Sequence, residues 1–483
     1  MTSPGPFLNM STYCNPLSIP NYPIGKVCRD IVRGSPSEPG SLWLLDQKEQ
    51  YRELADVTVL WYEDKWYMYP SVDMAWVSSD CGVSWKHYPL NVRDLGYAPT
   101  IVRHQGKFLL MASNSSIFSG ACPLGPFTEI GKISIPDGFP AQVDPMLFSD
   151  DDGRLYYFWG CTASGNIWGI ELHADHPPTL IGSPVKIVGF EPEKYPWQRC
   201  GDWNEDVNSG WLEGAWLFKR GGTYYFTYSA GGTENRTYAV GCLVGKSPLG
   251  PFTHQKNNPI QRATEGLVTG TAHGSGVEGP NGSLWSFYTL RAGVVHGWER
   301  RLGMDPGWIG EDGEFHVGQP SSLPVRITDK STGAEPSGWL PLNANRRTSA
   351  SSTATNLSSR LAVDNDLRTW WQPEANDPMP TLASVLVEGA IVRAIRIIWR
   401  DVGLDTLNEI IPGPFQYKVE LEIAPNDWKT VIDCSESRDD LLIDYRECVP
   451  TNALAARLVI LGAPVGIIPG VAEFTVFGEV GRR

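Results

Sequence analysis

The sequence predicts an all-β protein in which a five-bladed β-propeller is followed by a jelly-roll β-sandwich. The composition is the first indication, because 19 Trp, 50 Gly and 38 Pro in 483 residues are typical of aromatic-rich β-structure with many turns. The second is a hairpin design that occurs five times between residues 57 and 289. The third is a Pro-, Ser- and Gly-rich connection at 319–338, beyond which short alternating strands begin.

Each of the five units is an apolar run, a short polar turn and an aromatic run, which is the pattern of a β-hairpin. The residues just before the hairpins are separated by 42, 46, 69 and 60 positions, and repeats of this size indicate propeller blades. An ordinary β-sandwich with many hairpins is the alternative, but the shared turn design favours the propeller. The units are VTVLWYEDKWYMYPS from Val57, TIVRHQGKFLLMAS from Thr100, PMLFSDDDGRLYYFWG from Pro145, LEGAWLFKRGGTYYFTYS from Leu212 and GSGVEGPNGSLWSFYT from Gly274.

The chain is long enough for two domains. Residues 1–50 are a Pro-rich lead-in that we expect to lie on the propeller, and the blades follow within 51–320. We therefore expect a propeller domain over 1–335 and a β-sandwich domain over 336–483. The strands that indicate the sandwich are SVLVEG from Ser384, IRIIWR from Ile395, YKVELEI from Tyr417 and ARLVIL from Ala456.

Charge and targeting signals exclude several classes of partner. The formal net charge of −14 disfavours nucleic acid and anionic membranes, and no stretch is long and apolar enough to span a bilayer. The N-terminus has no basic region followed by an apolar run, so we expect a cytoplasmic protein, or a secreted one if this chain is already processed. The nine scattered Cys form no CxxC motif, so no zinc site is expected. The sequence does not indicate an oligomeric state.

Three acids stand immediately before apolar strands, at matching places in their units: Asp56, Asp144 and Glu213. The innermost strands of a propeller start near its axis, so these acids should meet in one pocket although they are distant in sequence. Glu213 is flanked by Trp211 and Trp216, and a carboxyl among apolar groups is pushed toward its protonated form. A protonated acid with a second carboxylate to activate water is the equipment for glycoside hydrolysis.

Five stretches resemble glycoside hydrolase family 43, and together they cover about residues 50–320. The resemblance implies a five-bladed propeller of inverting, mostly exo-acting hydrolases, with Asp56 as general base, Asp144 as the acid that positions and tunes the others, and Glu213 as general acid. Two motifs depart from the family's pattern, since Asp56 precedes Val57 instead of Pro and Glu213-Gly214 precedes Ala instead of Pro. The stretches are ELADVTVLWYEDKWYMYPS, DPMLFSDDDGRLYYFWG, LEGAWLFKRGGTYYFTYSAGGTENRTYAVGCLVGKSPLGPF, TAHGSGVEGPNGSLWSFYT and ERRLGMDPGWIGEDGEF.

The same resemblance implies two further site residues. His273, in AHGS, would lie beneath the sugar near the axis and help to hold a calcium ion or water; otherwise it is a core histidine. Arg300 would reach into the pocket, close to Asp144, and keep that acid ionised, while Arg301 should face the other way. The alternative for Arg300 is a surface charge. No cofactor is needed for the chemistry, and a structural Ca²⁺ at His273 is the single metal that we expect.

Aromatic side chains are candidates for sugar stacking. We name Trp76, Trp203 and Trp211, although any one of 19 Trp is more often a core residue. The acidic loop EKYPWQRCGDWNEDVNSGW, from Glu193 to Trp211, is the longest insertion between units, and such insertions commonly cap the active face and set specificity.

The second domain resembles a discoidin, or coagulation-factor type C, domain over about 345–480, on the stretch SSTATNLSSRLAVDNDLRTWWQP from Ser351 and the strands after it. That resemblance implies a jelly roll whose loops often bind carbohydrate. Trp370 and Trp371 could form a sugar platform, but a structural role is favoured for Trp370. The domain either binds polysaccharide or packs on the propeller.

The predicted function is therefore an exo-acting, inverting glycosidase that removes terminal pentoses from plant-type polysaccharide or oligosaccharide, with α-L-arabinofuranose as the first expectation. A β-xylosidase or a β-galactosidase or galactanase of the same fold is the alternative within this class. A propeller that binds carbohydrate without cleaving it is the alternative from another class, and the presence of all three carboxylates favours the enzyme.

Overall fold

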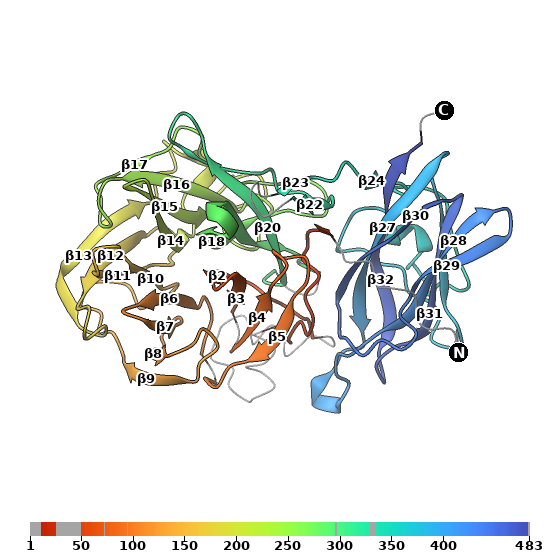
Figure 1. Cartoon of the computed structure of the whole chain (residues 1–483), viewed down its shortest axis with the longest axis horizontal. Coiled ribbons are helices and arrows are strands. Elements are labelled where there is room, and N and C mark those ends of the chain that lie inside the picture. Colours follow the sequence, from red (N-terminus) through yellow and green to blue (C-terminus); the bar gives the residue numbers. More distant parts are fainter. Residues whose placement is uncertain are drawn as a thin grey trace.

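The computed structural model describes residues 11–25, 50–71, 73–93, 95–294, 297–328 and 334–481. Five four-stranded antiparallel sheets radiate from a common axis, and two further sheets form a separate body at the C-terminal side (Figure 1). The predicted all-β fold, a five-bladed propeller followed by a β-sandwich, is therefore confirmed. Among the described residues, no helix has the length and apolar character required to cross a membrane.

Each blade is an up-and-down sheet whose strands pair in chain order. The first blade contains β2 (Thr58–Tyr62), β3 (Lys65–Tyr69), β4 (Met74–Ser78) and β5 (Lys86–Pro89), and the second β6 (Thr100–His104), β7 (Lys107–Met111), β8 (Ile117–Gly120) and β9 (Phe127–Gly131). The third contains β10 (Met146–Ser149), β11 (Leu155–Trp159), β12 (Asn166–Leu172) and β13 (Leu180–Gly189), and the fourth β14 (Glu213–Arg220), β15 (Thr223–Ala230), β16 (Ala239–Gly245) and β17 (Phe252–His254). The fifth contains β18 (Ala272–Glu278), β19 (Leu284–Arg291), β20 (Arg300–Ile309) and β21 (Phe315–Val317).

The inner hairpin of each blade follows from its turn residues. In the fourth blade, Gly221 and Gly222 both have positive φ, at 55° and 74°, which is the geometry of a two-residue turn that matches the strand twist. In the first blade, Glu63 and Asp64 adopt the same left-handed conformation, at 48° and 58°. Aromatic and branched side chains on the returning strands then pack between neighbouring blades, as Trp66 does with Phe287 at a ring separation of 5.1 Å.

A left-handed residue stands just before or at the start of the innermost strand of every blade. These residues are Asp56, Ala98, Asp144, Gly214 and His273, with φ between 40° and 61°. A non-glycine residue at positive φ is uncommon and carries a conformational cost, and such residues cluster at functional sites. The repeated kink turns the chain at the axis, where the blades meet.

Hydroxyl side chains join neighbouring blades at this same level. In four blades, a Ser or Thr six or seven residues into the returning run accepts, through its hydroxyl, the backbone N–H of the left-handed residue in the next blade. In the third blade the equivalent residue is Cys161. The four bonds run from Ala98 to Ser71, from Asp144 to Ser113, from His273 to Ser229 and from Asp56 to Thr289, with lengths of 2.7 to 3.0 Å.

The C-terminal sandwich packs a four-stranded sheet on a five-stranded sheet. Its interior contains fully buried apolar side chains such as Trp371, Val419 and Phe474. The first sheet has the order β24 (Leu340–Pro341), β32 (Ile468–Val480), β27 (Ala390–Val402), β30 (Ile443–Asn452). The second has the order β25 (Thr348–Ala350), β26 (Thr381–Val385), β31 (Ala455–Gly462), β28 (Gln416–Ala424), β29 (Asp427–Asp433).

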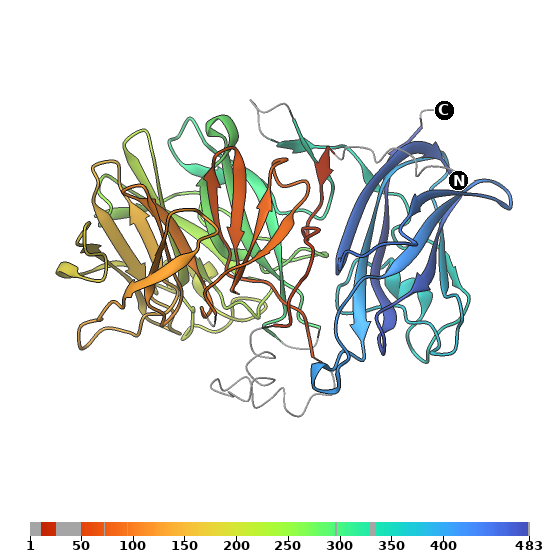
Figure 2. The ribbon, with the colours of Figure 1, turned by 60° about the horizontal axis from the view of Figure 1, so that its bottom comes forward.

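The N-terminal segment lies between the two bodies rather than on the propeller alone (Figure 2). Strand β1 (Thr12–Tyr13) joins β22 (Val325–Ile327) and β23 (Ala334–Pro336) in a small sheet, and the predicted domain boundary at 335/336 falls within β23. The N–H of Leu17 donates to Leu302 O in the fifth blade, and that of Asn21 donates to Asp440 O in the sandwich. Of the predicted lead-in, residues 1–10 and 26–49 lie outside the described residues.

Candidate active site

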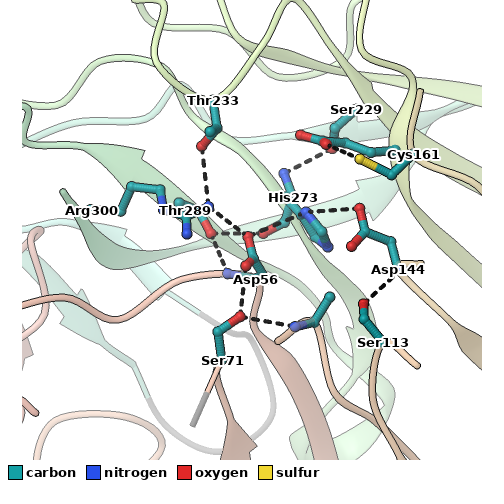
Figure 3. A network of polar contacts seen from close by, with 12 residues as sticks. Asp56, Ser71, Ser113, Asp144, Cys161, Ser229, Thr233, His273, Thr289 and Arg300 are labelled. Carbon is teal, nitrogen blue, oxygen red and sulfur yellow. Dashed lines mark hydrogen bonds and ion pairs between the residues drawn. The ribbon is translucent and has the colours of Figure 1, made fainter. Parts of the chain in front are cut away.

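A pocket of about 300 Å³ opens where the inner strands begin. Asp56, Asp144 and Glu213, the three acids predicted to converge, all line it, and so do His273 and Arg300. Asp56 comes from the first blade, Asp144 from the third and Glu213 from the fourth, so the propeller brings together residues that are far apart in the chain. Figure 3 shows the polar network around Asp56 and Asp144.

Asp56 is buried, with 5% of its surface exposed, and three side chains contact its carboxylate. Ser71 donates to Oδ2 at 2.6 Å, Arg300 Nη1 donates to Oδ1 at 3.0 Å, and His273 Nδ1 lies 3.3 Å from Oδ1. Burial alone would raise the pKa of Asp56, but Arg300, His273 and Ser71 together outweigh it, and the pKa is lowered. Asp56 is therefore held as a carboxylate, the state that a general base requires.

Asp144 has the opposite electrostatic environment. Burial raises its pKa to about 7, a rise that His273 opposes and that Glu213 and Asp56 reinforce. The predicted contact between Arg300 and Asp144 is not formed, which corrects the expectation that Arg300 keeps Asp144 ionised.

Arg300 instead bonds Glu53 and Asp56. Its Nε donates to Glu53 Oε1 at 2.5 Å while its Nη1 contacts Asp56. The reason is the circular order of the blades: Arg300 begins β20 in the fifth blade, which closes the ring against the first blade, whereas Asp144 belongs to the third. Arg301 faces the other way, as predicted, with its Nη2 2.9 Å from Glu299 Oε1.

Glu213 begins β14, is 8% exposed and accepts two hydrogen bonds from side chains. The Tyr238 hydroxyl donates to Oε1, and the Cys161 thiol donates to Oε2 at 3.0 Å. The surroundings of this carboxyl are thus more polar than the flanking Trp residues suggest. A register shift after Glu213 separates it from Trp216, whose indole N–H donates to Gly276 O inside the propeller.

His273 lies between two of the acids. Its Nδ1 is 3.3 Å from Asp56 and 3.9 Å from Asp144. Burial would lower the pKa of His273, but Asp56, Asp144 and Glu213 outweigh this effect and raise it. An imidazolium here offsets part of the negative charge of the pocket.

The candidate metal ligands are also these residues. Among the described side chains, Asp144, Glu213 and His273 offer donor atoms that all lie within 4.8 Å of one another. Ca²⁺ prefers six to eight oxygen ligands. This set offers one nitrogen and two carboxyl groups that the acid–base chemistry also needs, so water would have to complete a calcium shell.

Only one of the three predicted tryptophans lines the pocket. Trp211 does so, with 39% of its surface exposed. Trp76 is fully buried in β4 and donates its indole N–H to Pro20 O at 2.7 Å, so it is a core residue. Trp203 is 76% exposed, lies outside the pocket lining and stacks against Arg236 at 3.9 Å. The predictions for Trp76 and Trp203 are therefore wrong.

The sandwich tryptophans do not form a sugar platform. Trp371 is fully buried and donates its indole N–H to Ser352 O at 3.1 Å. The guanidinium of Arg400 covers the ring of Trp370 at 4.7 Å, which is consistent with the structural role favoured for that residue. The platform prediction is wrong because the bridge between Trp371 and Val471 of β32 places the second ring in the core.

Several pocket residues were not predicted from the sequence. Cys161 could have been found, because it aligns with Ser71 and Ser113 in the repeated hairpins. Tyr97 could have been found in the same way, because it precedes the second blade as Val143 precedes the third. Ser71 and Val143 belong to the same repeated positions. Four other side chains come from connecting segments without a shared pattern: Glu53, Thr233, Glu234 and Trp298.

Comparison with known proteins bears on the propeller. The sequence profile of glycosyl hydrolases family 43 matches residues 45–315. Beta-D-galactofuranosidase xynD of Aspergillus niger is 28% identical over 156 residues, which cover 32% of this chain and 39% of that protein. Xylosidase/arabinosidase 43A of Humicola insolens is 31% identical over 233 residues, covering 41% of this chain and 64% of that protein.

A solved structure described as a glycoside hydrolase has a TM-score of 0.48 at 19% identity, over 88% of this chain and 97% of that one. The chain spans less than two thirds of the length of the two curated relatives. The family profile, in contrast, covers more than half of the chain, from the lead into the first blade to the last strand of the fifth. The protein therefore belongs to glycosyl hydrolases family 43.

Proposed function

We propose that this protein is an exo-acting, inverting glycoside hydrolase that removes terminal pentose residues, with α-L-arabinofuranosides as the first substrates to test. The observation that carries the proposal is the pairing of unlike carboxyl groups in one pocket. Asp56 is held ionised by Arg300, His273 and Ser71, whereas Glu213 accepts hydrogen bonds from Tyr238 and Cys161. A carboxylate that can activate water and a second carboxyl group in the same pocket are the pair that glycoside hydrolysis uses.

The proposed reaction is a single displacement. Asp56 removes a proton from water as the water oxygen bonds the anomeric carbon, and Glu213 gives its proton to the departing glycosidic oxygen. The anomeric carbon exchanges one oxygen for another, and the configuration inverts. Asp144, whose pKa burial raises to about 7, would set the charge around Glu213. The exposed ring of Trp211 offers a face on which the sugar can stack.

β-D-Xylosides form the second candidate substrate class, because one of the similar proteins carries both names, xylosidase and arabinosidase. Another similar protein is named as a β-D-galactofuranosidase. A panel of 4-nitrophenyl α-L-arabinofuranoside, β-D-xyloside, β-D-galactoside and β-D-galactofuranoside separates these alternatives. We expect the highest kcat/KM on the arabinofuranoside, and a higher value on another glycoside would replace the assignment of the sugar.

Two variants distinguish the enzyme from a carbohydrate-binding propeller. Glu213→Gln cannot donate a proton, so turnover of substrates with poor leaving groups should fall by about 10²–10⁴-fold, while activated nitrophenyl substrates suffer less. Asp56→Asn should lose activity on both, because the base is needed whatever the leaving group is. The product anomer, read by NMR immediately after cleavage, should have the inverted configuration.

These outcomes can contradict the proposal. Equal losses on both substrate types for Glu213→Gln would exclude Glu213 as the acid. Full activity in Asp56→Asn would exclude the mechanism. If the wild-type protein binds but does not cleave sugars, the propeller is a binding module.

A structural Ca²⁺ and a discoidin-like role for the sandwich remain predictions. His273 would hold the ion together with water ligands in its neutral form, so the ion would displace the proton of the imidazolium. No step of the chemistry is assigned to the ion. Chelation should then lower the Tm without abolishing turnover. A discoidin-like sandwich that recruits polymer should retain the protein on insoluble arabinoxylan when the catalytic pocket is blocked by a soluble sugar.

A further inference from the structure

A short segment connects the sandwich with the catalytic pocket. Residues 50–56 contact the sandwich through Gln50 and Arg52 and end at Asp56. Successive side chains of this segment face opposite ways. Arg52 is directed to the sandwich, and Glu53 lines the pocket.

The contact of Arg52 with the sandwich is a buried double ion pair. Its Nη1 lies 3.0 Å from Asp401 and its Nη2 2.5 Å from Asp440, while 1% of the Arg52 side chain is exposed. Its Nε also donates to Tyr22 O at 2.9 Å, so the guanidinium is held on three sides. A buried charge without its partners strongly destabilises the folded protein, so the two carboxylates fix the position of Arg52.

The next residue carries the connection into the pocket. Glu53 is 5% exposed and lies 2.5 Å from both Nε and Nη2 of Arg300. The third nitrogen of the same guanidinium, Nη1, lies 3.0 Å from Asp56. The position of Arg300 over the candidate base therefore depends on Glu53.

The start of β20 is tied to this segment a second time. Arg301 Nη1 donates to Arg52 O at 2.7 Å, and the N–H of Leu54 donates to Arg300 O at 3.4 Å. In each of the two pairs one side chain faces the domain interface and the other faces the pocket. Arg52 and Arg301 face the interface, and Glu53 and Arg300 face the pocket. A shift of Arg52 would displace Glu53 and Arg300 together.

We propose that Asp401 and Asp440 of the sandwich are positioning residues for the active site: through Arg52 they hold the segment that aligns Glu53 and Arg300 with Asp56. The sandwich is thereby a part of the catalytic assembly, and not only a support or a substrate-binding module. This inference rests on the proposed function of the pocket. The position of Arg300 that it predicts can be tested in the absence of substrate and without measuring activity.

The kinetic test compares Asp401→Asn/Asp440→Asn with a control variant at the same interface. Glu447→Gln is the control, because Glu447 of the sandwich contacts the N–H of Ser11 and Thr12 at 2.7 and 2.8 Å, away from the segment 50–56. We expect the double variant to lose kcat on the order of 10–100-fold, as small misalignments do, with little change in KM. The control should keep the wild-type kcat. A double variant with wild-type kcat would overturn the proposal.

A mutant cycle tests whether the effect travels through Arg300. In an Arg300→Met background, the two Asn substitutions should lower kcat by a further factor of less than three, because the guanidinium that they position is already absent. Full additivity would overturn the proposed connection. If the double variant does not fold, Asp440→Asn alone is the second variant. The side chain at this position is 15% exposed, and Asn still presents an oxygen to Arg52.

A crystal structure of the same variants gives a readout that needs no activity. We expect the Arg300 guanidinium to leave its position beside Asp56 in the Asn variants and to keep it in Glu447→Gln. An unchanged contact of 3.0 Å in the Asn variants would overturn the positioning role even if the wild-type protein cleaved no glycoside. If the wild-type protein has no activity but Arg300 is displaced in the Asn variants, the proposed function is contradicted and the positioning role is not.

Discussion

Nη1 of Arg300 lies 3.0 Å from Oδ1 of Asp56, and the two side chains are largely buried, with 13% and 6% of their surfaces exposed. The two residues are 244 positions apart in the sequence. The contact decides the protonation state of the candidate base, because burial alone would raise the pKa of Asp56 and the neighbouring charges lower it.

Arg300→Met should therefore move the acidic limb of the kcat/KM profile to higher pH. Without the guanidinium, burial is opposed by His273 and Ser71 alone, so the pKa of Asp56 rises and the base becomes protonated at a pH where the wild-type base is ionised. Activity should fall most on the acidic side and recover partly as the pH rises. Arg326→Met, which removes an exposed arginine near Glu335, is the control and should keep the wild-type profile.

Trp211→Ala and Trp203→Ala should differ in their effect on KM. The ring of Trp211 lines the pocket, so its loss should raise KM about 10-fold or more, as the loss of one aromatic stacking contact does in other binding sites. Trp203 stacks on Arg236 outside the pocket lining, so its removal should leave KM for small glycosides unchanged. A larger effect from Trp203 would mean that the loop closes over bound sugar.

Cys161 can be tested against the other blades, where Ser or Thr occupies the same position. Cys161→Ser retains a donor for Glu213 and should keep kcat within about fivefold. Cys161→Val fills similar space without a donor, and an unsatisfied buried acceptor costs about 1–3 kcal/mol, so kcat should fall further. Equal kcat in both variants would show that the hydrogen bond at 3.0 Å does not orient Glu213.

Glu473 should make the stability of the sandwich depend on pH. Burial raises its pKa to about 8, although Arg396 opposes the rise, so the folded protein holds a proton that the unfolded chain releases. Stability should decrease as the pH rises from the unfolded pKa toward 8. Glu473→Gln mimics the protonated side chain and can still accept the N–H of Asn365.

The Tm of Glu473→Gln should equal that of the wild-type protein near pH 5 and exceed it near pH 9. Glu479→Gln is the control, because that side chain is 45% exposed. Parallel Tm profiles for Glu473→Gln and the wild-type protein would contradict the raised pKa.

Much of the propeller could be predicted because each blade repeats a local pattern. The inner hairpins close with two-residue turns in the first, second and fourth blades and with five-residue turns in the third and fifth. Each of them still pairs an apolar run with an aromatic run, so five hairpins predicted five blades. The convergence of Asp56, Asp144 and Glu213 followed from their place before the inner strands. Cys161 could have been predicted from the same repeat, since it aligns with Ser71 and Ser113.

The sequence by itself determined the order of hairpins, the residues that begin the inner strands, and hence which carboxyl groups meet at the axis, because these depend on turn chemistry and periodicity within about 40–70 residues. Only the tertiary structure decided that Trp76 is core, that Arg300 meets Asp56 and Glu53 instead of Asp144, and that Arg52 joins Asp401 and Asp440. These contacts arise where the ring closes and where the sandwich packs on it. The partner of a buried charge is set there by which surfaces meet, and no local pattern in the chain records that choice.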